Sequence, residues 1–166
     1  MSTTAAPRDQ RGFTLVELIV VILIIGILSA LALPRFINMG ADARTAKAEA
    51  ILGSVRSASE VVRAAALVRN QTAAAGSVSV DGVNITTRFG YPSAINGGTG
   101  AGGIVDAAGI DTSGNNTDGV TLAGGGAAAL VIQLNGATTP ATCSVSYTQP
   151  AAVNTTPVIS MATGGC

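Results

Sequence analysis

The sequence has no histidine and no tryptophan, and lysine occurs once, at Lys47. Because histidine is the commonest general base and metal ligand, its absence removes the usual routes to acid–base catalysis and metal binding. Aromatic residues make up 3% of the chain. With so few rings to stack on bases and no basic patch, no nucleic-acid-binding surface is evident. We therefore expect a protein that is not an enzyme, with no catalytic residues, no metal and no cofactor.

Charge is also absent from residues 18–33, and the apolar run extends back to Phe13, interrupted only by Glu17 and Thr14. Such a run is long enough to cross a bilayer as a helix, which needs about 20 residues. Residues 1–12 are polar and slightly basic. A carboxylate within a membrane helix is costly, so it usually has a charged partner or a functional role, unless its side chain reaches the headgroups at the membrane edge. Both interpretations of Glu17 are open at this point.

The apolar pattern becomes amphipathic after the span. Apolar residues recur at spacings of three and four, the period of one helix face; they are Ile51, Val55, Ala58, Val62 and Ala65. Abundant alanine favours the helix. The sequence therefore predicts one helix from Thr14 to about Asn70, about 80 Å long, with its first half in a membrane.

The rest of the chain predicts strands. Residues 77–86 alternate apolar and polar side chains on both sides of Asp81-Gly82, a strong hairpin signal. Residues 127–134, 143–148 and 157–161 are expected to be further strands, and residues 104–109 a helical turn. We expect an α+β fold in which an antiparallel sheet of four or five strands packs on the second half of the helix.

Two sets of side chains late in the chain suggest a disulfide and a possible calcium site. Cys143 and Cys166 follow an export segment, so an oxidising compartment and a disulfide are expected. Oxygen ligands for Ca²⁺ are offered by Asp106, Asp111, Asp118, Asn115 and Asn116. Their spacing does not fit the twelve-residue calcium loop, so a solvated turn is the favoured interpretation.

The string RGFTLVELIVVILIIGILSALALPRF, residues 11–36, resembles the start of a type IV prepilin. The resemblance implies that a prepilin peptidase cuts after Gly12 and that the new amino-terminal residue, Phe13, is N-methylated. It also implies that Glu17 meets the terminal amine of a neighbouring subunit during assembly. Two rivals are a signal peptide cut near Ala30-Leu31-Ala32 and an uncut membrane anchor.

The resemblance extends to the fold and its parts. It implies a leader at 1–12, a transmembrane or filament-core helix at 13–35 and a periplasmic or extracellular head at 36–166. Between Gly26 and Pro34 the helix is expected to lose helicity in the filament. The region bounded by Cys143 and Cys166 resembles the disulfide-bounded loop that such pilins display on the filament surface.

A narrower resemblance, to the mannose-sensitive haemagglutinin pilins, rests on scattered residues. They are 41–44, 80–82, 90–92 and the runs CSVSYT and TGGC near the end. In that subfamily the implied role is attachment to surfaces and glycans, which adds a surface or glycan receptor to the expected partners.

The function implied is a structural subunit that polymerises into a type IV pilus for adhesion, surface attachment or motility. Its partners would be copies of itself, the prepilin peptidase and the inner-membrane pilus assembly machinery. It would sit in the inner membrane as a single-pass protein before assembly and in an extracellular filament afterwards. The alternatives are a pseudopilin of type II secretion and a membrane-tethered glycan-binding module.

Overall fold

The computed structural model describes residues 13–95, 102–112 and 116–166, together with the backbone but not the side chains of residues 33–38. Its first element is a single α-helix, α1 (Leu15–Val68). The chain divides into two compact units, Met1–Met39 and Gly40–Cys166, so α1 contributes to both. The expected helix from Thr14 to about Asn70 is confirmed to within two residues at either end.

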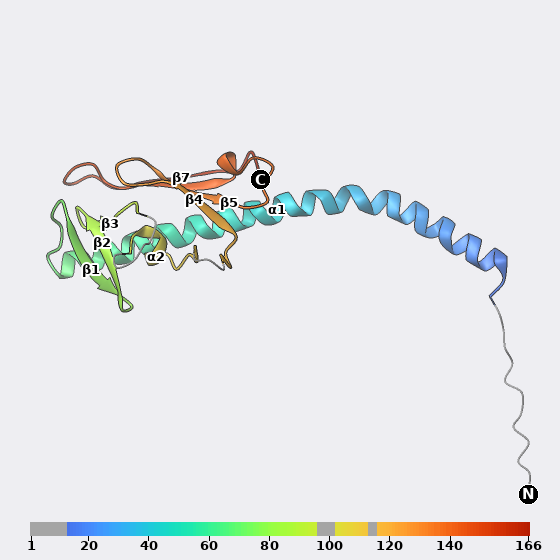
Figure 1. The fold of residues 1–166 in the computed structure, drawn as a ribbon, viewed down its shortest axis with the longest axis horizontal. Helices are drawn as coiled ribbons and strands as arrows, with labels where there is room; N and C mark the ends of the chain where they lie inside the picture. The colour runs from blue at the N-terminus through green and yellow to red at the C-terminus, as the bar shows by residue number, and fades with distance from the viewer. Residues whose placement is uncertain (1–12, 96–101, 113–115) are drawn as a thin grey trace, which may run out of the picture. The chain divides into compact units, whose positions relative to one another are not determined.

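The second unit, which we call the head, carries two antiparallel sheets (Figure 1). The first has the order β1-β2-β3 and the second the order β4-β5-β6-β7. The strands are β1 (Gly76–Val80), β2 (Val83–Arg88), β3 (Tyr91–Pro92), β4 (Val120–Gly124), β5 (Leu130–Leu134), β6 (Ser144–Thr148) and β7 (Val158–Ala162). A short helix, α2 (Ile104–Ala107), and a 3-10 turn, η1 (Pro140–Thr142), complete the head.

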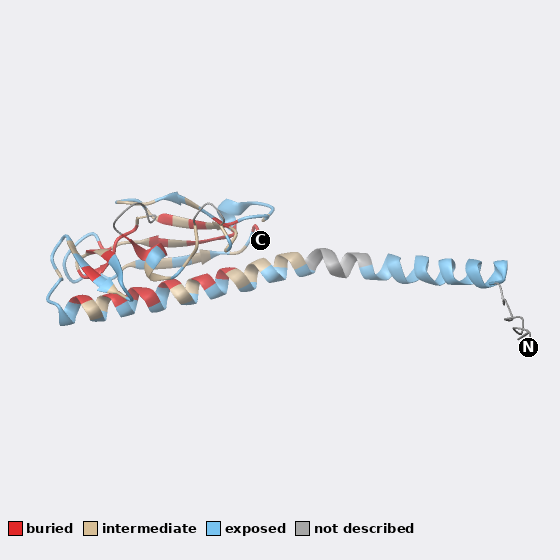
Figure 2. Ribbon diagram, turned by 60° about the horizontal axis from the view of Figure 1, so that its bottom comes forward, coloured by how far each residue is buried: buried red, intermediate tan, exposed pale blue. Residues whose placement is uncertain are grey.

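The core of the head lies between α1 and the sheets (Figure 2). Its larger cluster joins Ile51 and Val55 of α1 to Leu130, Ile132 and Val145 of the four-stranded sheet. A smaller cluster joins Val62 and Ala66 to Val78 and Ile85 of the three-stranded sheet. The helix stripe is the predicted one, except that Ala66 is buried where Ala65 was expected.

Both connections of the first sheet are two-residue turns. Asp81 and Gly82 have φ of 50° and 82°, and Val80 pairs with Val83. Positive φ at both central residues is the turn geometry that matches strand twist, which is why Asp-Gly predicted this hairpin. Phe89 and Gly90 repeat these values between β2 and β3, a turn that the sequence pattern did not reveal.

The expectation of one sheet of four or five strands is wrong, because the described residues form seven strands in two sheets. β3 is only two residues long and ends at Pro92, which has no N–H to extend a ladder. The chain then leaves the first sheet through α2 and starts the second at β4, a strand that was not predicted. The expected strands at 127–134, 143–148 and 157–161 are confirmed as β5, β6 and β7, and the helical turn as α2.

Tyr147 ties the two sheets together. It lies on β6, is fully buried, and donates a hydrogen bond of 2.7 Å from its hydroxyl to the backbone oxygen of Pro92 on β3. Burial raises the pKa of the Tyr147 hydroxyl above its ordinary value of about 10. The neutral hydroxyl therefore serves as a permanent donor at physiological pH.

We predict that Tyr147→Phe lowers the free energy of unfolding by about 1–3 kcal/mol, because it leaves the buried Pro92 oxygen without its donor. The matched control is Tyr91→Phe, which keeps the ring that lies 4.8 Å from the Arg63 guanidinium; it should change stability by less than about 0.5 kcal/mol. Urea unfolding of the full chain in detergent measures both. Equal effects of the two changes would contradict the role of the hydroxyl.

The pH dependence provides a second check on the same group. A raised pKa means that the folded chain holds the Tyr147 proton more tightly than the unfolded chain does. This contribution to stability is complete below about pH 10 and is lost as the pH rises further. The parent should therefore lose stability above pH 10 more steeply than Tyr147→Phe.

Candidate functional site

The start of α1 is organised by Thr14 and Glu17. The backbone N–H and the hydroxyl of Thr14 each donate to Glu17 Oε2 at 3.0 Å, and the Glu17 N–H donates to Thr14 Oγ1 at 3.3 Å. This reciprocal arrangement is a capping box, which satisfies N–H groups that a helix start leaves free. The Glu17 carboxylate is thereby held at the amino-terminal end of the helix, against the backbone N–H and the hydroxyl of Thr14.

Thr14 is the residue of this site that was not predicted from the sequence. The spacing Thr-x-x-Glu before an apolar run is itself the signature of a capping box, so the signal was present. Phe13, one residue earlier, is 92% exposed. Gly12 and the rest of the predicted leader lie outside the described residues, so the cleavage junction stays a prediction.

The apolar segment that follows is uncovered. Every side chain from Phe13 to Ala32 is exposed. Leu15–Ala32 is long and apolar enough to cross a membrane, as judged by length and composition. Exposed apolar surface of this extent marks a site of membrane or protein contact. Within the described residues of the first unit, no other element covers this half of α1.

Gly26 and Pro34 both lie inside α1, whose helical backbone runs through them without a break. An added Cβ at Gly26 would meet no atom within 4 Å, so the isolated chain does not need a glycine there. The loss of helicity expected between the two residues concerns the assembled filament and stays a prediction.

A filament map tests this prediction directly. We expect non-helical density between Gly26 and Pro34, because proline removes a backbone hydrogen bond and glycine weakens the helix. Gly26→Ala should extend the ordered helix toward Pro34, while Gly53→Ala, in the head part of the same helix, serves as the control. Continuous helical density from Leu15 to Val68 in parent filaments would contradict the prediction.

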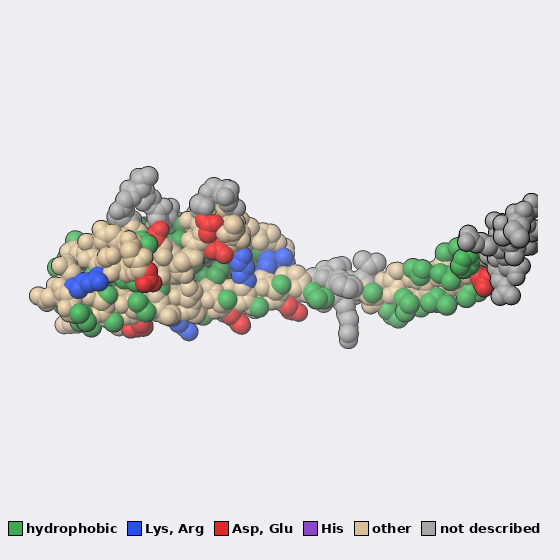
Figure 3. All heavy atoms as spheres, turned by 90° about the horizontal axis from the view of Figure 1, so that it is seen from below, with side chains coloured by type: hydrophobic (Ala, Val, Ile, Leu, Met, Phe, Trp, Pro, Cys, Tyr) green, Lys and Arg blue, Asp and Glu red, His purple; other side chains and the backbone are tan. Residues whose placement is uncertain are grey.

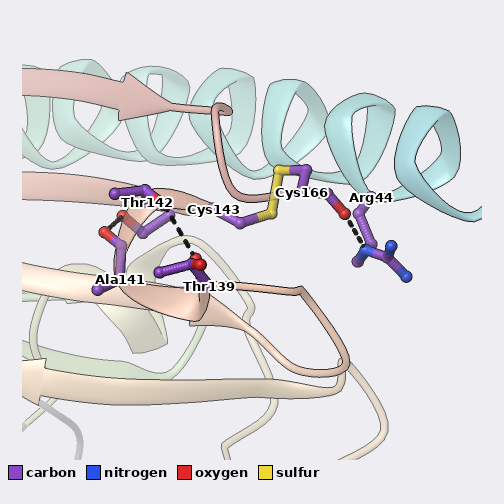
Figure 4. The surroundings of a disulfide bond; sticks show 7 residues. Arg44, Thr139, Ala141, Thr142, Cys143 and Cys166 are labelled. Atoms are coloured by element: carbon purple, nitrogen blue, oxygen red, sulfur yellow. Dashed lines mark hydrogen bonds between the residues drawn. A yellow bond between two sulfur atoms is a disulfide. The ribbon is translucent and has the colours of Figure 1, made fainter.

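The two cysteines form the predicted disulfide. Cys143 and Cys166 are joined with a Cα–Cα distance of 4.8 Å, and both are buried. The bond links the start of β6 to the residues after β7. Arg44 of α1 donates from Nε to the backbone oxygen of Cys166 at 2.6 Å, which ties the disulfide to the helix (Figure 4).

Further hydrogen bonds hold the end of the head in place. Gly165 N–H donates to the Thr142 oxygen at 3.0 Å, and Thr139 N–H donates to the Gly165 oxygen at 3.1 Å. β7 lies between the two cysteines in the sequence and forms an edge of the second sheet. Its residues are alternately exposed and half-buried. One of its side chains, Val158, is 66% exposed. The disulfide therefore anchors a region whose outer edge is open to contact.

We predict that Cys143→Ser/Cys166→Ser lowers the free energy of unfolding by about 3 kcal/mol, because the bond closes a loop with a sequence separation of 23. Urea unfolding measures the loss, and thiol reduction of the parent is the matched control that leaves the sequence unchanged. Non-reducing peptide mapping should recover both cysteines in one cross-linked species. Two free thiols in the purified protein would contradict the disulfide.

Two of the acidic residues considered as calcium ligands accept hydrogen bonds from backbone N–H groups of nearby turns. Asp106 Oδ2 accepts from Gly103 N–H at 2.9 Å at the start of α2, while Asp118 Oδ2 accepts from Asp111 N–H at 2.7 Å. Asn116 bonds to Val120 through both its amide atoms, and Asn115 lies outside the described residues. In the described ranges no group of three or more acidic, Cys or His side chains could hold a metal ion.

Two comparisons with known proteins find similarity that includes the amino-terminal part of the chain. Residues 7–33 match the prokaryotic N-terminal methylation motif. The chain is 52% identical over 48 residues to the type IV narrow pilus major component PilA5 of Thermus thermophilus, covering 29% of this chain and 41% of that protein.

Other relatives are similar over segments of the same size. The type IV major fimbrial protein FimA of Dichelobacter nodosus is 43% identical over 51 residues, or 31% of this chain and 33% of FimA. The type IV major pilin protein PilA of Myxococcus xanthus is 46% identical over 52 residues, or 31% of this chain and 23% of PilA. The chain thus spans between 23% and 41% of the length of these relatives. No solved structure is significantly similar to it.

Proposed function

We infer that this chain, a type IV pilin by its amino-terminal methylation motif and its relatives, is a structural subunit that polymerises into a type IV pilus. The observation that carries the proposal is the exposed apolar half of α1, which coincides with the matched motif. A segment that is stable in a membrane and then in a filament needs this apolar surface on all sides of the helix. The relatives are named as pilus and fimbrial components, which favours a pilus over a secretion pseudopilin.

Under this proposal, each of three segments of the chain has its own role in processing and assembly. Residues 1–12 are a leader that the prepilin peptidase removes after Gly12, and Phe13 becomes the N-methylated terminus. Residues 13–35 anchor the subunit in the inner membrane and later form the filament core. Residues 36–166 form the head, which faces the periplasm before assembly and the exterior afterwards.

Surface attachment would belong to the head. Its open edge at β7, held by the disulfide, offers contact to a surface or glycan receptor, as the resemblance to mannose-sensitive haemagglutinin pilins implies. The role is structural and calls for no catalytic group or cofactor. The inner-membrane assembly machinery would extract the subunit by its head and pack it through its apolar helix.

The test is electron microscopy of material sheared from cells that make the chain, combined with intact mass and N-terminal sequencing. We expect filaments that bind an antibody raised against the head and contain a chain beginning at N-methylated Phe13. A chain that stays in the membrane, uncut and without filaments, would support a tethered glycan-binding module instead. A mature start near Leu33 would support an ordinary signal peptide.

A further inference from the structure

A cavity of about 260 Å³ lies in the head where α1 ends, between the last turns of the helix, the β2–β3 turn and the connection from β6 to β7. It is lined by Arg63, Leu67, Thr72, Phe89, Val153 and Asn154. Apolar walls with a few polar groups and a charge are typical of sites for small ligands. The lining therefore has the composition of a binding site.

Arg63 of α1 supplies the charge of this cavity. Its Nη1 donates to the backbone oxygen of Phe89 at 2.7 Å, and its guanidinium carbon lies 4.8 Å from the centroid of the Tyr91 ring. Neither contact neutralises the charge, and Arg63 makes no ion pair within the part of the chain that the structure describes. A guanidinium has several more N–H donors. This half-buried cation is thus free to pair with an anionic ligand.

The β2–β3 turn is shaped around the Arg63 guanidinium. Gly90 has a φ of 82°, and a Cβ added to it would collide with Arg63 Nη1. Phe89 has a φ of 50°, in a region that bulky residues rarely adopt and where turns of this type prefer Asn, Asp or Gly. Strained positions of this kind cluster at ligand-binding sites. The aromatic side chain at this turn is therefore explained by a role in the cavity that it lines.

Arg88 adds a second positive charge beside the cavity. Its guanidinium carbon lies 5.5 Å from the centroid of the Phe89 ring, and its Nε donates to the backbone oxygen of Pro150 at 3.2 Å. Pro150 belongs to the connection that also carries Val153 and Asn154. None of the residues that line the cavity is acidic. The electrostatic potential inside the cavity therefore favours an anion.

The other lining residues restrict the kind of anion. Thr72 and Asn154 each offer a hydrogen-bond donor and an acceptor, as the hydroxyl groups of a sugar require. Phe89, Leu67 and Val153 provide an apolar wall for the carbon atoms of a ring. A free amino acid would leave its ammonium group without an acidic partner in this lining.

A polyanion is a poorer match than a small ligand. On the face of the head that Figure 3 shows, charged side chains lie in small separate groups. Nucleic acids and polyphosphates are bound by extended basic patches. Recognition at this cavity would instead depend on the local geometry around one arginine.

We propose that the cavity binds a sugar that carries a carboxylate, namely a hexuronic acid unit of an acidic polysaccharide. The carboxylate pairs with Arg63, whose planar fork matches two carboxylate oxygens. Thr72 and Asn154 bond to the ring hydroxyls, and the ring carbons lie against Phe89. The inference rests on the proposed function in that a displayed head is what meets a polysaccharide, but the cavity itself does not depend on assembly.

Binding to the full chain, in a detergent without a sugar head group, tests the proposal without requiring filaments. Titration of methyl β-glucuronide, followed by saturation-transfer NMR of the sugar, should give a Kd of about 1 mM for a ligand of this size. Methyl β-glucoside has the same ring without the carboxylate and should bind at least about tenfold more weakly. N-acetylglycine and inorganic phosphate, added as competitors, should displace the glucuronide only at concentrations at least about tenfold above its own Kd.

Asn154→Asp is the most direct variant, because it introduces a negative charge with a side chain of the same shape. The position is exposed, and aspartate tolerates its φ of 60° as asparagine does. We expect glucuronide binding to weaken at least about tenfold and glucoside binding to stay within about twofold. Asn84→Asp is the matched control, since Asn84 is also exposed but does not line the cavity.

Phe89→Asn tests the aromatic wall. It introduces a residue that the turn prefers, so the midpoint of thermal unfolding should not fall. Binding of both sugars should weaken at least about threefold, because the ring carbons lose their apolar contact. Unchanged binding in this variant would contradict the arrangement of the sugar against Phe89.

The outcomes separate this site from the proposed pilus function. No binding of glucuronide, equal binding of glucuronide and glucoside, an unchanged Kd in Asn154→Asp, or tighter binding of N-acetylglycine or phosphate would overturn the acidic-sugar site. None of these results concerns filaments, which microscopy measures separately. A chain that binds glucuronide as expected but builds no filaments would overturn the pilus function and leave the site standing.

Discussion

Gly12→Leu should abolish filaments and leave the uncut precursor in the membrane. The predicted cut lies between Gly12 and Phe13, and a peptidase must bring its catalytic groups against the backbone at this junction. Glycine permits such an approach because it has no side chain. A leucine would block the cut and would also leave the polar leader attached to the end of α1, which has to enter an apolar filament core.

The measurement is the intact mass of the membrane-bound chain together with microscopy of sheared material. Gln10→Leu is the matched control: it introduces the same side chain two residues earlier and should leave cutting and filaments at parent level. A Gly12→Leu chain that is processed to Phe13 would show that the junction is misplaced. A Gly12→Leu chain that is not cut but still forms filaments would show that processing is unnecessary for assembly.

The helix and its buried stripe could be predicted from the sequence because they depend on local periodicity. Ile51, Val55 and Val62 follow a single helix face, and they are buried as expected. The hairpin at Asp81-Gly82 was predictable for a similar reason, since two residues with positive φ determine the turn. In each case the information lies within a few residues of the feature it specifies.

The division into two sheets could not be predicted in the same way. It depends on which strands pair across the sequence, and the contact between Tyr147 and Pro92 joins residues 55 positions apart. Alternation of apolar and polar residues indicates that a segment can form a strand, but it does not determine which other strand pairs with it. β4 was not predicted because the segment is short and lies between turn residues and a run of three glycines, so no clear alternation marks it as a strand.

Three cationic side chains of α1 that turn toward the head show a related limit of prediction from sequence. Arg44, Lys47 and Arg63 alternate with the apolar stripe of α1, as solvent-facing residues of an amphipathic helix do, yet each donates to a backbone oxygen of the head. They lie at the border of the buried stripe, where a long side chain can cover apolar surface and place its charge at the edge. Whether such a side chain turns inward depends on where the opposing loops lie. The local sequence pattern does not specify the position of those loops.

Glu17→Leu should give a chain that is inserted and cut after Gly12 but does not polymerise by itself. Glu17 is the only charge between Arg11 and Arg35, and the predicted new terminus lies four residues before it. A carboxylate and an amine left apart in an apolar filament core are each costly, whereas together they neutralise one another. We therefore expect the pairing of Glu17 with the Phe13 amine of a neighbour to align each incoming subunit, and the filament yield of Glu17→Leu to fall at least about tenfold.

The capping box raises a competing explanation, which a second variant resolves. Glu17 also accepts hydrogen bonds from Thr14 in its own chain, so its loss could act through a frayed helix start. Thr14→Val removes the hydroxyl and keeps the carboxylate. If Glu17 acts between subunits, Thr14→Val should still build filaments while Glu17→Leu does not. Equal loss in both variants would assign Glu17 to the helix cap. Parent-level filaments from Glu17→Leu would leave its carboxylate with no part in assembly.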